Sequence, residues 1–323
     1  MAYSDTVLSR ARARLEQARQ NSEEEFSHRK EEIYAAHPRL KEIELQMRAT
    51  VAQVVTASFS GGDPSDAVRR AKAENLSLQE ERSMIMLESG IDESDLEYVP
   101  ICRDCGGTGY IGERMCSCLK ELCRQEQKKE LSALLAGKES FDNFRLDYYS
   151  ELVDPDYGVS PRRVMTKTFE LCRSYAKNFG KGAENLLFSG LPGLGKTFLS
   201  ACIARTVAEG GFSVVYDSAG KLFSDFEQEK FGEKKSGATR KYLECDLLII
   251  DDLGTELVTQ FTQSALYQVV NTRLMAGRAT IVSTNFTSEE LEATYSPQLA
   301  SRLLGAYRLV PFCGKDIRRM KKD

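Results

Sequence analysis

The stretch NLLFSGLPGLGKTFLSACIARTVAEGG, residues 185–211, decides the fold of this chain. Its centre, GLPGLGKT, fits the spacing G-x4-G-K-T of a phosphate-binding loop. The apolar residues before the loop predict a strand, and the pattern after it predicts a helix. A strand, a glycine-rich loop and a helix in this order form the setting in which such a loop binds nucleotide phosphates.

The glycines, the lysine and the threonine of this loop each have a physical task. Glycine allows backbone N–H groups to turn toward phosphates, and the helix N-terminus adds a favourable field. Lys196 is expected to reach the β- and γ-phosphates, and Thr197 is expected to bind Mg²⁺. The glycines of the predicted site are Gly190, Gly193 and Gly195.

A second set of polar residues follows two apolar runs. DLLIIDDLG predicts a buried strand that ends in Asp251 and Asp252. Asp251 is expected to belong to the shell of groups around Mg²⁺, and Asp252 is expected to orient the attacking water. ATIVSTN predicts another strand, after which Asn285 reaches toward the water or the γ-phosphate. Paired acids are ordinarily a solvated turn, but their position behind an apolar strand favours the nucleotide site.

Strand and helix patterns alternate through the second half of the chain. The apolar runs are NLLFSG, SVVYDS, DLLIID, ATIVST and YRLVPF, with helical patterns between them. This alternation predicts an α/β fold, a parallel sheet with helices on both faces.

The first hundred residues have a different pattern. Apolar residues at helical spacing predict one helix over residues 6–34, a second that begins at Pro38, and a third over residues 65–89 that ends at Gly90. SGGDP, residues 60–64, predicts a break. The apolar stripe is thin, so it indicates either a small helical core or a docking face for a partner helix.

Four cysteines lie between these halves, in CRDCGGTGYIGERMCSC. Their spacing, C-x2-C-x10-C-x-C, predicts one tetrahedral Zn²⁺ site with four thiolate ligands and hence a structural role. The ligands are Cys102, Cys105, Cys116 and Cys118. The glycines between the pairs permit the tight turns that this spacing requires. A redox dithiol and an iron–sulfur cluster are the alternatives.

The five other cysteines are scattered, and only Cys123 lies near enough in sequence to compete as a ligand. The cluster CRDCGGTG also resembles the CxxCxGxG repeat of DnaJ-type zinc domains. That pattern occurs once here, so the resemblance extends only to the metal chemistry.

Composition excludes several classes of protein. The formal net charge of −4 gives no global basic field for nucleic-acid binding. The sequence contains no run of about 18 apolar residues, so no membrane span is expected. The N-terminal residues lack the apolar centre of a secretory signal, so a cytoplasmic protein is expected.

Taken together, the motifs resemble those of the AAA+ ATPases, specifically the DnaC/DnaI-type replicative helicase loaders. The resemblance runs from about Phe141 to Arg319, through FDNF, GLPGLGKT, DLLIIDDLG, STN, SRLLG and GKDIR. It implies that ATP, with Mg²⁺, is the nucleotide. It also implies that Arg302 is an arginine finger that acts on a neighbouring subunit, and that Arg318 is a sensor-2-like residue. Asn285 would be sensor 1.

The resemblance implies two domains and two macromolecular partners. Residues 1–138 would be a helical, zinc-binding domain that binds a hexameric replicative DNA helicase, and residues 139–323 the ATPase domain. Single-stranded DNA would be the second partner, and the ATPase domain would self-associate. Stacking on aromatic rings beside cations is the physical requirement for DNA contact. The candidate residues are Lys221, Phe223, Phe226, Lys230 and Phe231, and helix core is the alternative for the phenylalanines.

Two departures from the family pattern affect these expectations. The second acid is Asp252, where many AAA+ enzymes have glutamate, so slow hydrolysis is expected. KDIRRMKKD is too short to build a helical lid, so a neighbouring subunit closes the site or it stays open. The alternative functions are an IstB-like ATPase that assists a transposase and a zinc-stabilised ATP-binding adaptor with little turnover.

Overall fold

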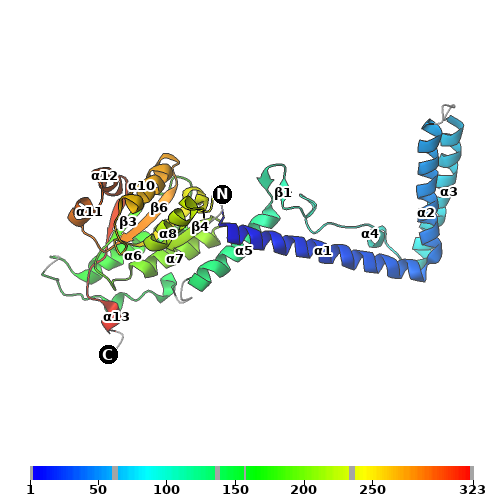
Figure 1. Cartoon of the computed structure of the whole chain (residues 1–323). Helices are drawn as coiled ribbons and strands as arrows, with labels where there is room; N and C mark the ends of the chain where they lie inside the picture. Colours follow the sequence, from blue (N-terminus) through cyan, green and yellow to red (C-terminus); the bar gives the residue numbers. More distant parts are fainter. Residues whose placement is uncertain (1–2, 60–64, 135–138, 156–157, 233–236, 321–323) are drawn as a thin grey trace. The chain divides into compact units, whose positions relative to one another are not determined.

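The computed structural model describes residues 3–59, 65–134, 139–155, 158–232 and 237–320 (Figure 1). The chain divides into two compact units, one of which is Ala13–Cys116. The other combines Met1–Arg12 with Ser117–Asp323 and contains the large sheet. We call the first the helical unit and the second, after the activity expected from its sequence, the ATPase unit.

The ATPase unit is an α/β structure, as predicted. All five predicted strands form, in the order β4-β5-β6-β3-β7, and every neighbouring pair is parallel. The strands are β3 Leu186–Ser189, β4 Val214–Ser218, β5 Leu247–Leu253, β6 Ala279–Thr284 and β7 Arg308–Pro311.

Alternate residues of each strand bury into two separate cores. Leu186 and Ile249 belong to the core under helices α5, α6 and α7, whereas Leu187 and Ile250 face α8, α10, α11 and α12. Both faces are therefore covered, which explains why the strands read as continuous apolar runs. The helices are α5 Ser117–Leu134, α6 Pro161–Lys177, α7 Lys196–Glu209, α8 Ala219–Lys230, α9 Arg240–Glu244, α10 Gln260–Met275, α11 Ser288–Thr294, α12 Pro297–Ala306 and α13 Ile317–Met320. Two short 3₁₀ helices, η1 Phe141–Asn143 and η2 Leu146–Tyr148, precede α6.

Helix α5 packs against the ATPase unit, although the predicted boundary at residue 138 assigned it to the other half of the chain. Its Leu131 is buried in the core that α6 and α7 share. The Gln127 amide donates to the Phe212 carbonyl at 2.9 Å and accepts the Val214 N–H at 2.9 Å. These bonds cover backbone groups at the start of β4, an edge strand that would otherwise present them unpaired. Accordingly, the longer of the two segments that form this unit begins at Ser117 and includes α5.

The helical unit contains the three predicted long helices, of which α1 also extends into the ATPase unit. They are α1 Asp5–Ala36, α2 Pro38–Phe59 and α3 Ser65–Ser89, followed by α4 Glu93–Leu96 and the hairpin of β1 Tyr110–Ile111 and β2 Arg114–Met115. Gly90 follows α3 with a φ of +65°, as expected of a C-terminal glycine. The predicted break at residues 60–64 lies outside the described residues.

The core of the helical unit is small. Leu40, Met86 and Leu96 are buried together, with a few half-buried neighbours. Several apolar side chains of α2 and α3 are exposed, among them Leu45 and Leu87. None of the helices in the described part of the chain is long and apolar enough to cross a membrane.

Candidate functional site

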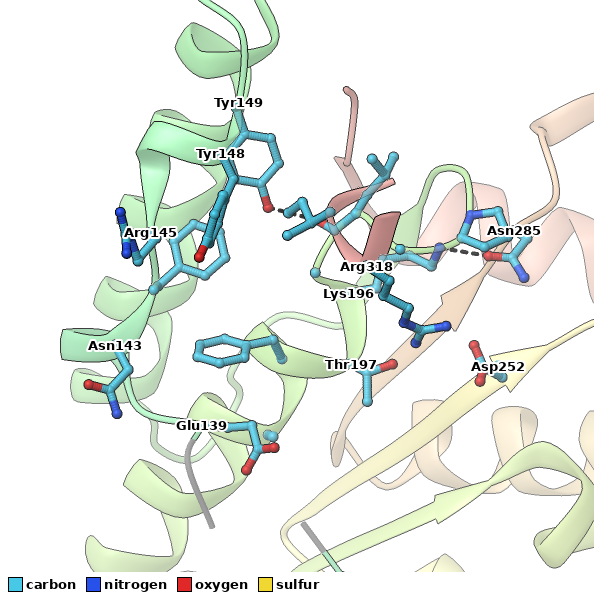
Figure 2. Close-up of a pocket in the computed structure, with 18 of the residues that line it drawn as sticks. Glu139, Asn143, Arg145, Tyr148, Tyr149, Lys196, Thr197, Asp252, Asn285 and Arg318 are labelled. Carbon is cyan, nitrogen blue, oxygen red and sulfur yellow. Dashed lines mark hydrogen bonds between the residues drawn. The ribbon is translucent and has the colours of Figure 1, made fainter. Parts of the chain in front are cut away.

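The phosphate-binding loop connects β3 to α7 and lines a cavity of about 510 Å³ (Figure 2). The sequence-predicted residues that line this cavity are Gly193, Gly195, Lys196, Thr197, Asp252, Asn285 and Arg318. They come from four places that are distant in the sequence: the loop, the end of β5, the end of β6 and α13. The carboxyl ends of parallel strands meet at this edge of the sheet, where α/β proteins bind their ligands.

Lys196 is buried at the centre of this arrangement, with 5% of its surface exposed. Its ammonium donates to the carbonyls of Gly190 and Leu191 at 2.5 and 2.9 Å and to Asn285 Oδ1 at 2.7 Å. Burial lowers its pKa, and the charges of Asp252 and Asp251 act in the opposite direction. The ammonium thus has acceptors that the oxygens of a phosphate can replace.

The two acids at the end of β5 have different surroundings. Asp251 is buried, and its carboxylate accepts hydrogen bonds from Tyr216, at 2.6 Å, and from Ser283. Asp252 lines the cavity and is more exposed, with a φ of +55°. Burial, followed by the charge of Asp251, raises the pKa of Asp252. The inner acid is thus fixed by hydrogen bonds and the outer acid faces the cavity, and their roles in the metal shell and at the water stay predictions.

Arg302 lies apart from this cavity. Its guanidinium donates to Asn271 Oδ1 at 3.0 Å and to the Gln298 carbonyl at 3.2 Å. It also lies 4.7 Å from the centre of the Tyr267 ring. Arg302 is not among the described residues that line its own chain's nucleotide cavity, so any action on a nucleotide requires a second chain.

The segment between α5 and α6 supplies one whole wall of the cavity, a role that the sequence reasoning missed. Tyr148, Tyr149 and Phe144 line the cavity with Glu139, Asn143 and Arg145 (Figure 2). Three aromatic rings beside a phosphate-binding loop form an apolar region suited to a nucleotide base. The high aromatic content of ESFDNFRLDYYS was the available signal.

The four predicted metal ligands come together. Their sulfur atoms all lie within 4.8 Å of one another, and Cys102 Sγ lies 3.8 Å from Cys116 Sγ. A tetrahedron with Zn–S bonds of about 2.3 Å has edges of about 3.8 Å, so the sulfurs are spaced for one zinc ion. The Gly109 N–H donates to Cys105 Sγ at 3.3 Å, the kind of bond that stabilises a thiolate. Gly106, Gly107, Gly109 and Gly112 all have positive φ values, as the tight turns require.

Cys123 is not part of this cluster. It is buried within α5, and burial raises its pKa to about 11. It therefore behaves as a small apolar side chain. The four other scattered cysteines, Cys172, Cys202, Cys245 and Cys313, are buried as predicted.

Comparison with known proteins identifies the ATP-binding part. The profile of the family "IstB-like ATP binding protein" matches residues 151–318, which is more than half of the chain. The chain belongs to the IstB-like ATP-binding family.

The relatives of this IstB-like protein each match a part of the chain. YdaV of Escherichia coli K12 is 29% identical over 135 residues, covering 41% of this chain and 53% of YdaV. The replicative helicase loader DnaC of E. coli K12 is 25% identical over 169 residues, covering 51% of this chain and 62% of DnaC. The chain thus spans about half to three-fifths of the length of these relatives. A crystal structure of the DnaC helicase loader is similar with a TM-score of 0.46 and 19% identity, covering 54% of this chain and 97% of that one.

The predicted DNA-contacting residues of the IstB-like protein separate into two groups. Phe223 and Phe226 are buried in the core beneath α8, so they are not available to stack on bases. Lys221 forms an ion pair with Asp225 at 2.6 Å. In contrast, 69% of the Phe231 surface is exposed. The Lys230 ammonium lies 5.9 Å from the Phe231 ring centre and 5.0 Å from the Phe261 ring centre.

Proposed function

We propose that this protein is an ATP-dependent loader that binds a hexameric replicative DNA helicase and delivers it to single-stranded DNA in the cytoplasm. The observation that carries the proposal is the 25% identity to DnaC, a replicative helicase loader, over 169 residues, beside a cavity lined by a phosphate-binding loop. The family match supports ATP binding by this part. To ATP binding the proposal adds three properties: binding of the helicase, binding of single-stranded DNA, and hydrolysis of ATP.

The cavity residues provide the parts that ATP hydrolysis requires. Lys196 is available to bind the β- and γ-phosphates, and the fixed carboxylate of Asp251 to hold the metal shell with Thr197. Asp252 and Asn285 face the same cavity and would orient the attacking water. A bound Mg²⁺ would neutralise charge that develops on the phosphates. Arg318 contributes a cation from α13.

The helical unit presents the surface that we assign to the helicase. Leu76, Met84 and Leu87 of α3 are 57%, 60% and 85% exposed. Spacings of eight and three residues place them on one face of the helix. Exposed apolar residues on a small core are typical of a surface that a partner covers. A zinc ion on the four cysteines, three of which belong to this unit, would stabilise it, since the apolar core among its described residues is small.

Co-elution with the host's replicative helicase tests the proposal. We expect the protein to form a complex with the helicase in the presence of ATP and Mg²⁺. Leu76→Ser combined with Met84→Ser should abolish the complex, whereas Met275→Ser, at an 83% exposed site on α10, should leave it intact. A protein that binds ATP but never co-elutes with the helicase would contradict the loader proposal.

A transposition helper is the second candidate function. The family profile is named for IstB-like proteins and matches only residues 151–318, the part that loaders and such helpers share. Co-elution with a transposase in place of the helicase would favour this candidate. Binding of ATP without turnover, alone or with either partner, would favour the adaptor.

A further inference from the structure

A tyrosine hydroxyl from the segment before α6 holds one peptide of the phosphate-binding loop. Tyr149 Oη donates a hydrogen bond of 2.8 Å to the carbonyl of Leu194. Tyr149 is 1% exposed, and Leu194 is equally buried. The two residues are 45 positions apart, so this bond depends on tertiary packing.

The direction of this carbonyl determines the direction of a donor. In a trans peptide the C=O of one residue and the N–H of the next point in opposite directions. A Leu194 carbonyl held toward Tyr149 therefore directs the N–H of Gly195 away from Tyr149. Gly195 lines the nucleotide cavity, and backbone N–H groups of such loops are the ligands of phosphate oxygens.

A second segment holds the preceding peptide in the same manner. The Ile317 N–H donates to the Gly193 carbonyl at 3.1 Å. By the same geometry this bond orients the N–H of Leu194. Two successive peptides of the loop are thus held by residues outside the loop. One is held by Tyr149, which precedes the loop in the sequence, and the other by Ile317, which follows it.

The tyrosine is itself rigidly held. The Arg162 Nε–H donates to its backbone carbonyl at 2.9 Å, and its ring stacks on Phe144 with centres 5.9 Å apart. A Cβ atom at Gly195 would lie 3.0 Å from the hydroxyl oxygen, so this close approach favours glycine at position 195. Burial raises the pKa of Tyr149, so the hydroxyl stays a donor at neutral pH.

We propose that Tyr149 is a positioning residue for ATP binding, whose hydroxyl holds the Leu194–Gly195 peptide in the orientation that phosphates require. This inference rests on the assignment of the cavity to ATP. A preorganised donor costs nothing to align when the ligand arrives, and this is the source of its contribution. Without the hydroxyl, the peptide loses this hydrogen bond, and the binding of phosphates must supply more of the ordering.

Tyr149→Phe tests the proposal, with Tyr175→Phe as its matched control. Tyr175 in α6 also donates its hydroxyl to a backbone carbonyl, that of Glu184, at 2.9 Å, but it does not line the cavity. We expect Tyr149→Phe to weaken the binding of Mg²⁺–ATP about tenfold, which corresponds to about 1.4 kcal/mol. Binding of adenosine, measured by competition, should stay within twofold, because adenosine has no phosphates. Tyr175→Phe should leave both affinities unchanged.

Other outcomes separate this inference from the site assignment. Equal weakening of ATP and adenosine by Tyr149→Phe, or unchanged ATP affinity in a variant with an unchanged melting temperature, would overturn the positioning role. Lys196→Ala serves as the reference, because it should lose ATP binding whatever Tyr149 does. If Lys196→Ala also binds ATP like the parent, the cavity assignment fails and the inference fails with it.

Discussion

The two units of this protein differ in the size of the apolar core that stabilises each of them. In the ATPase unit, four successive residues of β5, Leu247 to Ile250, are at most 1% exposed, because helices cover both faces of the sheet. In the helical unit, the core centres on Leu40, Met86 and Leu96, and much apolar surface of α3 remains exposed. The first unit therefore has a core that can stabilise it alone, and we expect the second to gain stability from a bound metal and a partner.

This difference indicates what each unit can do. A rigid sheet edge holds residues from four distant segments in fixed positions around one cavity, as the proposed hydrolysis would require. A unit with a small core and exposed apolar residues gains stability when it binds another protein. The comparison leads to predictions in which one unit responds and the other does not.

The largest effect is expected from loss of the metal. Cys102→Ser with Cys116→Ser should remove one zinc ion per chain and loosen the helical unit, because structural zinc supplies about 10 kcal/mol or more in small domains. ATP affinity should stay unchanged. Elemental analysis, limited proteolysis and ATP titration measure the three effects.

Cys123→Ser is the matched control for this pair. Cys123 is buried but lies outside the four-sulfur cluster, so its loss should leave the metal content unchanged. Full resistance to proteolysis in metal-free parent protein would refute the structural role of the metal. Iron in place of zinc would favour the iron–sulfur alternative.

The next largest effect is expected at Arg302. An arginine supplied by a neighbouring chain accelerates phosphoryl transfer by roughly 10³-fold or more. Arg302→Ala should retain ATP affinity and lose this stimulated turnover. Mixing it with Lys196→Ala should restore part of the activity, since each variant supplies the group that the other lacks.

Arg308→Ala is the control for Arg302. Arg308 is exposed and forms an ion pair of 3.2 Å with Glu184, a contact worth under about 1 kcal/mol. Turnover should be unaffected by its loss. If Arg302→Ala behaves like Arg308→Ala at every protein concentration and mixing gives no gain, Arg302 is an ordinary surface arginine.

A smaller effect on hydrolysis is expected at Asp252. Asp252→Asn should bind ATP normally and hydrolyse it roughly 10²-fold more slowly, the lower range for loss of a general base. Because the pKa of Asp252 is raised, the carboxylate becomes protonated at a higher pH than an ordinary aspartate. Turnover by the parent should therefore decline on acidification earlier than an ordinary aspartate would cause, and Asp252→Asn should lack this decline. Identical pH profiles for the two proteins would exclude Asp252 as the group that titrates.

The sequence predicted the parts of the site that depend on local order. Lys196 and Asp252 were found because a spaced motif and an acid after an apolar run each occupy a fixed place on a parallel sheet. The cysteine cluster was predicted for a similar reason, because the spacing of the two cysteine pairs allows their four sulfur atoms to surround one metal ion. The hydrogen bond from Tyr149 to Leu194 could not be predicted, because the two residues are 45 positions apart and only packing brings them together.

The phenylalanines of α8 illustrate a second limit. Phe223 and Phe226 have helical spacing that is equally typical of a core face and of a stacking surface, and the structure buries both. Phe231, only five residues beyond Phe226, is exposed because α8 ends at Lys230. Local pattern predicted the helix, while the neighbouring elements determined which side chain faces solvent.

The smallest effect is expected from Phe231, and it tests whether the ATPase unit binds DNA directly. Its exposed ring lies beside the Lys230 ammonium, a pairing that suits a base and a phosphate of single-stranded DNA. Stacking of one base contributes about 1–3 kcal/mol, so Phe231→Ala should weaken the binding of single-stranded DNA at least about fivefold. ATP affinity should not change, because Phe231 does not line the nucleotide cavity. Met275→Ala removes an even more exposed apolar side chain from α10 and should leave DNA binding intact. Anisotropy with a labelled oligonucleotide, at one fixed salt concentration, measures both variants. If Phe231→Ala and Met275→Ala bind DNA equally well, the stacking contact is excluded, and any DNA binding by this unit must then rest on other residues.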